Sequence, residues 1–313
     1  MDGLNNIVPS LTHSLTGDSF KSKPVFFSGT SKRVLPNPVP NSLILSAIED
    51  LTVVDTVNGA RMILPTGDTV FILIPRHASI RNMTHVSKTL TSLHAVDNAK
   101  GFAKTRGKRR IPVAEDHGKY TTVGLKPNRG HAGITESWPN KLSQEDKNEI
   151  VKLMKRCEEV AKGYLPSNEL RGIEIAKLLG NWSEIKEGES RPAIWGSLAI
   201  ALNYYLNSHT DQDFFYSMTT IASAHGLRQD MDRYSMEAEV CNYFTFAEHG
   251  IAVALRPGDM MLFNPMYQHC LSSRTSFYES KDVFSLSLYL NTAIVRKNDN
   301  TIPLTDLDLY SLK

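Results

Sequence analysis

From Ile194 onward, short apolar segments alternate with turn residues, and this pattern constrains the fold more than any other feature of the sequence. The Arg256-Pro257-Gly258-Asp259 stretch suits a type II turn, because glycine accepts the positive φ that the third position requires. Many short strands in antiparallel succession predict a sandwich or a barrel. The expected strands lie near residues 198–206, 214–222, 240–246, 250–255, 259–263, 266–272 and 282–290.

The last of these strands alternates between polar and apolar side chains. Because successive side chains of a strand point to opposite faces, one face can pack under helices while the other lines a site. The more polar face comprises Val283, Ser285, Ser287 and Tyr289, and the apolar face comprises Phe284, Leu286, Leu288 and Leu290.

Two helices are predicted ahead of these strands. Ser143, with Asp146 three residues later, is typical of a helix N-cap, and Gly163 can end the helix. The first helix carries an apolar stripe at helical spacing, and the second runs from about residue 168 to 179, where Gly180 ends it. Both are expected to pack on the sheet. The stripe comprises Ile150, Met154, Cys157, Val160 and Ala161.

The N-terminal part of the chain begins with an arm and a strand-like stretch. Residues 1–42 are rich in Pro, Ser, Asn and Thr without sustained periodicity, which indicates a loosely ordered arm. Residues 51–75 contain β-branched runs separated by Asn58-Gly59, which favours a type I′ hairpin, and by the turn residues 65–68. We expect a small antiparallel meander here, either as its own subdomain or as extra strands on the main sheet.

Composition places the chain among ordinary globular proteins. With 313 residues, 41% hydrophobic and 22% charged, it can bury a substantial core. Its three cysteines are too few and too scattered for a disulfide framework or a structural zinc site, so a reducing compartment is expected. The N-terminus lacks the features of a signal peptide, and no apolar run is long enough to cross a bilayer. We therefore expect no membrane association and a cytoplasmic or nuclear location.

A basic segment interrupts this even composition. From Arg76 to Arg110 there are nine Lys or Arg residues and one acid, Asp97, giving this segment a net charge of +8 within a chain of net charge +2. The densest part is Lys104–Arg110, KTRGKRR. Such a cluster can bind the phosphates of a nucleic acid or serve as a nuclear address, and it can equally be a solvated surface loop.

The chemistry of the chain centres on His209-Thr210-Asp211 and on His269, which follows 58 residues after Asp211. Two neutral imidazoles and one carboxylate on one face of Fe(II) leave the remaining positions open for a cosubstrate and O₂. An HxD motif alone is weak, since ten histidines make a chance match common. The position of His209 between two strand-like segments and of His269 after a predicted hairpin strengthens the hypothesis. The alternative is a barrel histidine beside a turn aspartate.

Residues 195–295 resemble the double-stranded β-helix of the Fe(II)/2-oxoglutarate dioxygenase superfamily. The resemblance rests on the order of HTD, GIAVALRPGDMMLFNPMYQHCLSS and a final alternating strand, and the TET/JBP-like nucleic-acid base oxygenases have a similar layout. It implies a jelly-roll barrel, so that with the predicted packing helices and N-terminal β-meander we expect an α+β chain. The expected divisions are an arm (1–42), a meander with the basic segment (43–110) and an oxygenase-like domain (111–313), with helices at 143–180 and the barrel at about 195–295.

The resemblance also implies that His209, Asp211 and His269 hold Fe(II), with 2-oxoglutarate and O₂ as cosubstrates. The family usually places Arg or Lys some ten or more residues after the distal His, often two residues before a serine, to bind the far carboxylate of 2-oxoglutarate, but Val283 lies two residues before Ser285 here. Arg274 and Lys281 are the candidates, and Arg274 is favoured because guanidinium binds carboxylate through two parallel hydrogen bonds. Tyr205, Tyr216 and Ser285 are second-rank candidates to hydrogen-bond the same cosubstrate.

Three functions remain open at this point. The first is a dioxygenase that hydroxylates a C–H bond of a nucleic-acid base, a protein side chain or a small molecule. The second is a cupin-like metal-binding barrel that does not turn over 2-oxoglutarate, and the third is an inactive scaffold that binds through the basic segment. The polar insertion at residues 224–239 could cover a substrate or could be an exposed connection.

Overall fold

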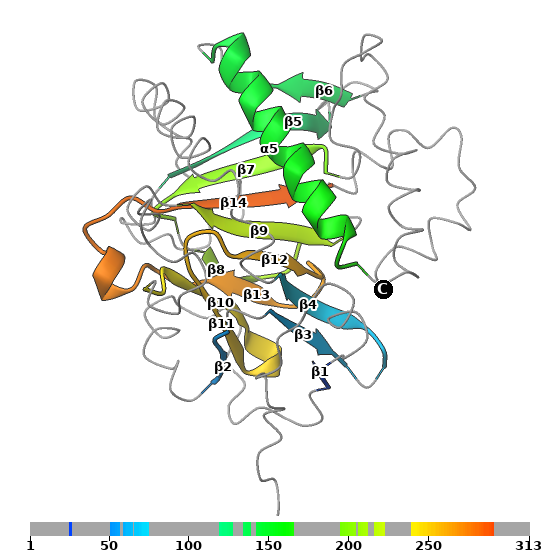
Figure 1. Ribbon diagram of the computed structural model, residues 1–313, viewed down its shortest axis with the longest axis vertical. Helices are drawn as coiled ribbons and strands as arrows, with labels where there is room; N and C mark the ends of the chain where they lie inside the picture. The colour runs from blue at the N-terminus through cyan, green and yellow to red at the C-terminus, as the bar shows by residue number, and fades with distance from the viewer. Residues whose placement is uncertain are drawn as a thin grey trace, which may run out of the picture.

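Two β-sheets and one long helix make up the described part of the computed structural model (Figure 1). The described residues are 25–26, 51–56, 59–64, 66–74, 119–127, 134–138, 142–165, 195–204, 206–211, 216–222 and 239–290. The predicted helix at 168–179, the basic segment Lys104–Arg110 and all of the insertion at 224–239 except Glu239 lie outside these residues.

The larger sheet has nine strands in the order β1-β3-β4-β12-β9-β14-β7-β5-β6. All of its described pairs are antiparallel except β1 with β3. Its strands are β1 (Val25–Phe26), β3 (Ala60–Ile63), β4 (Thr69–Ile74), β5 (Lys119–Pro127), β6 (Ile134–Ser137), β7 (Ser197–Leu202), β9 (Ser217–Ala222), β12 (Met260–Phe263) and β14 (Phe284–Tyr289).

The smaller sheet has five strands in the order β2-β11-β10-β13-β8. Gly250, at φ 60°, ends the short 3-10 helix η3 (Ala247–His249) that joins β10 to β11. A second 3-10 helix, η4 (Ser276–Tyr278), lies between β13 and β14. The strands are β2 (Thr52–Val54), β8 (Leu206–His209), β10 (Asn242–Phe246), β11 (Ile251–Leu255) and β13 (His269–Leu271).

The two sheets pack face to face through an apolar core. Phe244 and Phe246 of the small sheet meet Phe71 and Phe263 of the large sheet in this core, and the rings of Phe71 and Phe246 stack with centroids 5.3 Å apart. Both sheets therefore have one face directed toward a shared interior.

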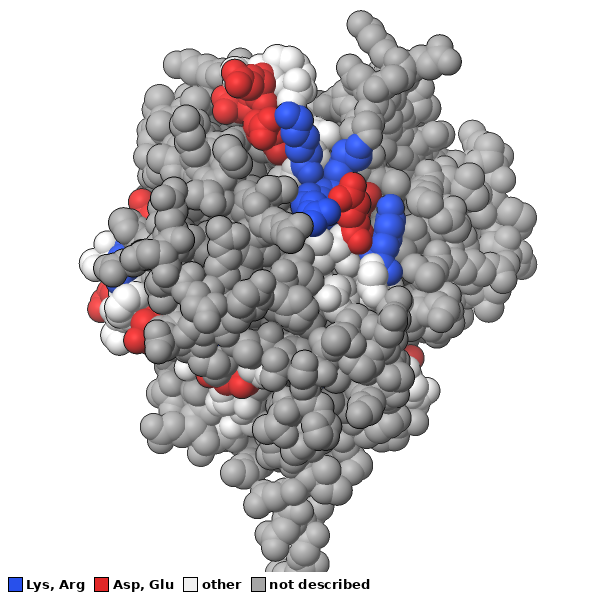
Figure 2. Space-filling model, viewed as in Figure 1, with Lys and Arg blue, Asp and Glu red and all other residues white. Residues whose placement is uncertain are grey.

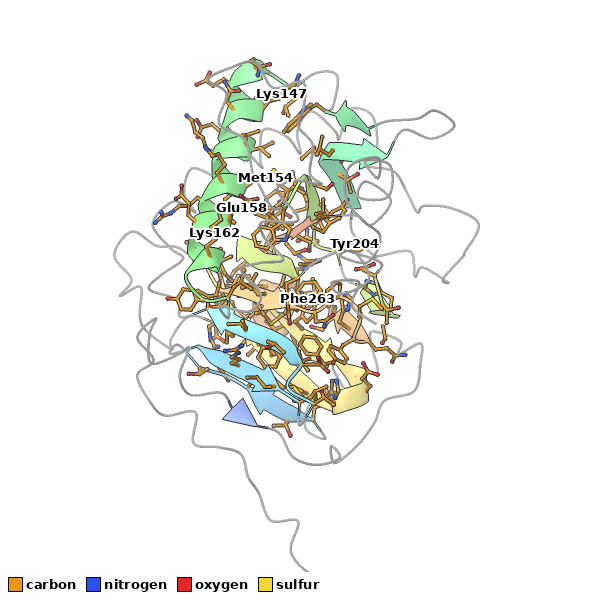
Figure 3. The ribbon with its side chains drawn as sticks, turned by 90° about the vertical axis from the view of Figure 1, so that its right-hand side faces the viewer. Lys147, Met154, Glu158, Lys162, Tyr204 and Phe263 are labelled. Atoms are coloured by element: carbon orange, nitrogen blue, oxygen red, sulfur yellow. The ribbon has the colours of Figure 1, made fainter. Side chains whose placement is uncertain are left out.

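Helix α5 (Gln144–Lys162) covers the other face of the large sheet (Figure 1). The predicted N-cap is confirmed, because the Ser143 hydroxyl accepts the Asp146 N–H at 3.0 Å. Met154 and Glu158 point toward the sheet (Figure 3), and the Glu158 carboxylate accepts the Trp195 N–H at 2.8 Å. Acidic and basic side chains alternate on the solvent side of this helix (Figure 2), which marks an ordinary solvated surface.

The alternation predicted for the last strand is confirmed. Phe284, Leu286 and Leu288 of β14 belong to the core beneath α5, whereas Val283, one residue before the strand, belongs to the core between the sheets. Ser285 therefore points to the interior between the sheets and is 8% exposed. The type II turn after β11 is confirmed too, since Gly258 has φ 88° and the Asp259 N–H donates to the Arg256 carbonyl at 3.0 Å.

The single strand expected at 198–206 is wrong, because it is two strands in two different sheets. β7 ends at Leu202 in the large sheet, and β8 begins at Leu206 in the small one. Asn203 takes φ 51° between them, and three hydrogen bonds hold it in this conformation. Its backbone N–H donates to the Val283 carbonyl, and its side-chain oxygen accepts the Val283 N–H. Its side-chain nitrogen donates to the Asp282 carboxylate. This left-handed residue redirects the chain from one sheet to the other.

The expected hairpin at Asn58-Gly59 is also wrong. β2 does not pair with β3 but adds to the small sheet, parallel to β11, while β3 and β4 form an antiparallel pair in the large sheet. Gly59 does have a positive φ of 82°, so the local preference is real although the strands on either side part. A bidentate ion pair between Arg256 and Asp55 holds the end of β2 against the turn that follows β11.

The described architecture is a two-sheet sandwich with one covering helix. Among the described strands, no pairing joins an edge of one sheet to an edge of the other, so closure into the expected jelly-roll barrel stays a prediction. The strands at 60–74 are extra strands of the large sheet, which was one of the two alternatives expected for them. Within the described residues, no helix is long and apolar enough to span a membrane.

Candidate metal centre

His209 and His269 lie opposite each other on neighbouring strands of the small sheet. His209 is the last residue of β8 and His269 the first of β13, and the two are direct partners in the antiparallel register. Asp211 follows β8 by two residues, and its N–H donates to the Pro265 carbonyl in the β12–β13 connection at 2.9 Å. The sheet register and this one hydrogen bond therefore bring together residues separated by almost 60 positions in the sequence.

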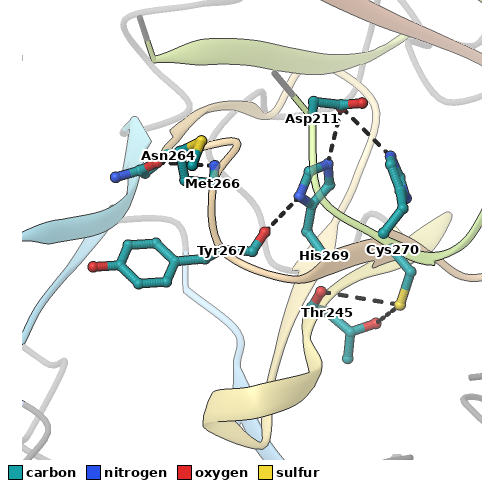
Figure 4. Close-up of polar contacts among 8 residues, drawn as sticks. Asp211, Thr245, Asn264, Met266, Tyr267, His269 and Cys270 are labelled. Atoms are coloured by element: carbon teal, nitrogen blue, oxygen red, sulfur yellow. Dashed lines mark hydrogen bonds and ion pairs between the residues drawn. The ribbon is translucent and has the colours of Figure 1, made fainter. Parts of the chain in front are cut away.

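The three side chains converge on a common point, and Figure 4 shows Asp211 and His269 directed toward each other. One Asp211 carboxylate oxygen lies 3.4 Å from Nε2 of His209 and 3.4 Å from Nε2 of His269. The ligand atoms of the three residues all lie within 4.8 Å of one another, and the two imidazole rings are 4.4 Å apart between centroids. Among the described residues, this is the group of His, Cys, Asp and Glu side chains that could hold a metal ion.

Burial and mutual contact tune the protonation of these groups. Burial by itself would raise the pKa of Asp211, but the adjacent His209 and His269 side chains outweigh it and hold that pKa well below its usual range. Burial lowers the pKa of His269. At neutral pH the site therefore favours an ionised carboxylate and a neutral His269 imidazole, which is the protonation that metal coordination needs.

The hydrogen bond at Nδ1 of His269 indicates whether the site suits a metal. Its Nδ1 lies 2.8 Å from the Tyr267 carbonyl oxygen, which can only accept, so Nδ1 carries the proton (Figure 4). In the neutral ring, the lone pair of Nε2 then faces the Asp211 carboxylate at 3.4 Å. Two electron-rich groups placed this close favour a cation between them, and a carbonyl behind the ring is the usual support for a metal-binding histidine.

Aromatic packing holds the His269 ring in this orientation. The ring is 3% exposed and stacks nearly parallel on Phe244, with an interplanar angle of 7° and centroids 5.5 Å apart. Phe263 contacts it at a tilt, with centroids 4.9 Å apart. By contrast, Asp211 has 45% of its side chain exposed and Thr210 is exposed, so the site opens to solvent on the Asp211 side.

Small hydroxyl side chains line the interior of the large sheet. Ser217 is directly opposite Phe263, and Thr219 is opposite both Met261 and Ser287, which places them with Ser285 on the face toward the small sheet. Ser217, Thr219 and Ser285 are 2%, 2% and 8% exposed. These buried hydroxyl side chains give the interior face of the large sheet a polar wall.

The structure describes one of the two tyrosines predicted to contact the cosubstrate, Tyr216. The Tyr216 side chain belongs to the core beneath α5, and its hydroxyl donates to the Thr69 carbonyl at 3.3 Å. Its own carbonyl accepts the indole N–H of Trp195 at 2.7 Å, so the contacts of Tyr216 are those of a packing residue. Tyr205 lies outside the described residues. Their roles toward a cosubstrate stay predictions.

Arg274 and Lys281 both lie in the connection between β13 and β14. One guanidinium nitrogen of Arg274, Nη1, donates to the Lys281 carbonyl at 2.6 Å and to the Tyr278 carbonyl at 3.2 Å, which braces this connection. The Lys281 ammonium lies over the Phe277 ring, 3.1 Å from its centroid. Each cation therefore already has a local contact, and any carboxylate would have to use the remaining N–H groups of Arg274 or displace Lys281 from the ring.

Several residues that shape the site have no signal in the sequence. Tyr267 acts through its backbone carbonyl and Pro265 likewise, so their side-chain types say nothing of these roles. Phe244 lies in a strand of ordinary core composition, and only the packing of the two sheets places it against His269. The position of Tyr267, two residues before His269, could have indicated a local contact but not its kind.

Comparison with known proteins gives matches among solved structures only. No family model matches the sequence, and no curated protein matches it. Similar structures include NgTET1 in complex with 5mC DNA, with 10% identity, 82% of this chain and 92% of that chain covered, and a TM-score of 0.49. OsALKBH1 is 9% identical, covers 71% of this chain and 96% of its own, and has a TM-score of 0.38. A prolyl-4-hydroxylase from Pseudomonas putida is 10% identical, covers 71% of this chain and 92% of its own, and has a TM-score of 0.35.

Another similar structure, from Burkholderia pseudomallei, is described as an oxidoreductase of the 2OG-Fe(II) oxygenase family; it has 10% identity, covers 64% of this chain and 76% of that chain, and has a TM-score of 0.32.

Proposed function

We propose that this protein is an Fe(II)- and 2-oxoglutarate-dependent dioxygenase that hydroxylates a C–H bond. The observation that carries the proposal is the convergence of His209, Asp211 and His269 on one point. Two imidazoles and a single carboxylate make the facial donor set of non-haem Fe(II) oxygenases, whereas structural zinc sites use four protein ligands and are rich in cysteine. The three cysteines of this chain are buried and lie outside the cluster.

The residues of the chain divide the work between binding, orientation and exclusion of water. His209, Asp211 and His269 would hold the iron, which when bound with 2-oxoglutarate and O₂ supplies the oxidising chemistry. The Tyr267 carbonyl keeps the His269 lone pair directed at the site, and Phe244 and Phe263 shield that ring from water. The open side near Thr210 and Asp211 is where a substrate would enter.

For the far carboxylate of 2-oxoglutarate we propose Arg274, with Lys281 as the alternative and Ser285 as a hydrogen-bond donor. Ser285 points to the interior near the start of β14, directly after the connection that contains both cations. Since Nη1 of Arg274 bonds two carbonyls, its other N–H groups would bind the carboxylate.

The test is succinate formation from 2-oxoglutarate by the purified, iron-loaded protein. Arg274→Ala should raise the 2-oxoglutarate concentration for half-maximal turnover about tenfold or more, because a hydrogen bond to a charged group contributes roughly 1.5–3 kcal/mol. Lys281→Ala should leave it near the wild-type value. The reverse pattern would make Lys281 the anchor, and no effect from either variant would remove both assignments.

A cupin-like metal site without 2-oxoglutarate turnover is the competing function. Adding 2-oxoglutarate to the Fe(II) protein without oxygen distinguishes the two, because a keto acid bound through two oxygens gives a visible charge-transfer band. Wild-type protein that binds Fe(II) but develops no such band and forms no succinate would favour the cupin-like function.

We propose a nucleic-acid base as the first substrate class to test, on the strength of the basic segment Lys104–Arg110. If this segment neutralises phosphates, affinity for DNA or RNA should fall steeply with salt, and neutralising Lys108, Arg109 and Arg110 together should flatten that dependence. Affinity measured by fluorescence anisotropy between low and physiological salt provides the check. Absent or salt-insensitive binding would leave a protein side chain or a small molecule as the substrate.

A further inference from the structure

We infer that Glu248 is a positioning residue for the metal centre and acts on His269 through a single peptide unit. The inference rests on the proposed metal site and extends it to a residue outside the ligand cluster. Glu248 lies in η3, between β10 and β11, whereas the ligands lie at the end of β8, two residues after it and at the start of β13. Its Oε1 accepts the Gln268 N–H at 3.0 Å, and this contact joins the β10–β11 connection to the β12–β13 connection.

The two ends of one peptide bond carry the two relevant hydrogen bonds. The Gln268 N–H and the Tyr267 C=O belong to the same planar unit and point in opposite directions. Glu248 accepts from the N–H end, and the C=O end accepts from Nδ1 of His269 at 2.8 Å. The plane of this peptide therefore sets where the carbonyl points, and through it the orientation and tautomer of the His269 ring.

The negative charge of Glu248 also polarises the groups along this path. A carboxylate at the N–H end polarises the peptide and makes its carbonyl oxygen a stronger acceptor. A stronger acceptor behind His269 raises the basicity of Nε2, which is the effect that a directly bound carboxylate has on many metal-binding histidines. In this chain, the carboxylate of Glu248 exerts the effect from one peptide farther away.

The rest of the β12–β13 connection is held as well, so Glu248 acts on an otherwise ordered turn. The Asn264 side chain accepts the Met266 N–H at 3.0 Å (Figure 4), and the ring of His249 contacts the Tyr267 ring edge-on, with centroids 5.2 Å apart. The Pro265 carbonyl of the same turn binds the Asp211 N–H. This one turn thus contacts two of the three metal ligands, and η3 holds its far end.

The experiment compares Mn(II) affinity in Glu248→Ala, Glu248→Gln and wild type, with Glu279→Ala as an exposed control at the end of η4. Glu248→Ala should weaken Mn(II) binding about 10–100-fold, the range for loss of an outer-shell partner. Glu248→Gln keeps an oxygen acceptor without the charge, so its loss should be smaller, below about tenfold. Glu279→Ala should bind as wild type, and all metal-free variants should melt close to wild type.

A second measurement needs no metal. At pH 8, nitrogen-15 spectra of the histidine rings should show the wild-type His269 protonated at Nδ1, and Glu248→Ala should show a mixture of both tautomers. Unchanged Mn(II) affinity or an unchanged tautomer in Glu248→Ala overturns the inference. Wild-type protein that binds neither Mn(II) nor Fe(II) overturns the proposed function instead, and the tautomer comparison still decides the role of Glu248.

Discussion

Replacing Asp211 with alanine is expected to abolish succinate formation and to weaken Mn(II) and Fe(II) binding by more than about 100-fold, beyond the usual range for outer-shell changes. Asp211 supplies the one carboxylate of the cluster, and its oxygen lies 3.4 Å from Nε2 of each imidazole. Without it, two neutral imidazoles remain, and two neutral ligands hold a divalent cation poorly.

Asp211→Asn refines this prediction, because the amide keeps the shape and removes the charge. We expect its metal affinity to fall between those of alanine and wild type and its turnover to be lost. Calorimetric titration with Mn(II) and an assay of succinate provide the readouts, and Asp68→Asn, in the turn before β4, is the matched surface control. Full turnover by Asp211→Ala would end the iron hypothesis.

The second large effect is expected at Phe244, whose replacement should lower both the stability of the protein and its metal affinity. Truncation to alanine should lower the free energy of unfolding by about 3–5 kcal/mol, since it opens a cavity in a packed core. That cavity lies against the His269 ring, which stacks on Phe244 with centroids 5.5 Å apart. A ring that has lost its stacking partner can tilt away from Asp211, so metal affinity should fall as well.

A control on the opposite face of the large sheet separates these two effects. Leu288 is fully buried in the core beneath α5, and Leu288→Ala should cost about 2–5 kcal/mol. We expect its metal affinity, measured below its melting range, to match wild type. Equal losses of Mn(II) affinity in Phe244→Ala and Leu288→Ala would show that the ring contact with His269 has no specific role.

Local features of the fold were predictable because each depends on neighbouring residues. The Ser143 cap of α5, the type II turn at Pro257-Gly258 and the alternation of β14 all follow from preferences that act within four residues. The same preferences gave a wrong hairpin at Asn58-Gly59, although Gly59 does take a positive φ. A turn preference states how one residue bends, and it does not state which sheet the next strand joins.

Longer-range relations were not predictable, as residues 198–206 illustrate. Their apolar character is continuous, yet Asn203 breaks the segment because Asp282 and Val283, some 80 positions away, hydrogen-bond to it. The charge of Arg274 likewise suggested a ligand contact, while the structure directs its Nη1 to two carbonyls of its own connection. Such partners are known only when the strands are in register.

What the sequence by itself determined is the donor set: two histidines and an aspartate at the ends of strands, which is the chemistry that an Fe(II) site requires. Only the tertiary structure decided that His209 and His269 are opposite each other in adjacent strands, with Asp211 turned toward both. Only it placed the Tyr267 carbonyl and the Glu248 carboxylate behind His269. The physical reason is that residue type specifies the available lone pairs and charges, whereas strand register and sheet packing specify where they point.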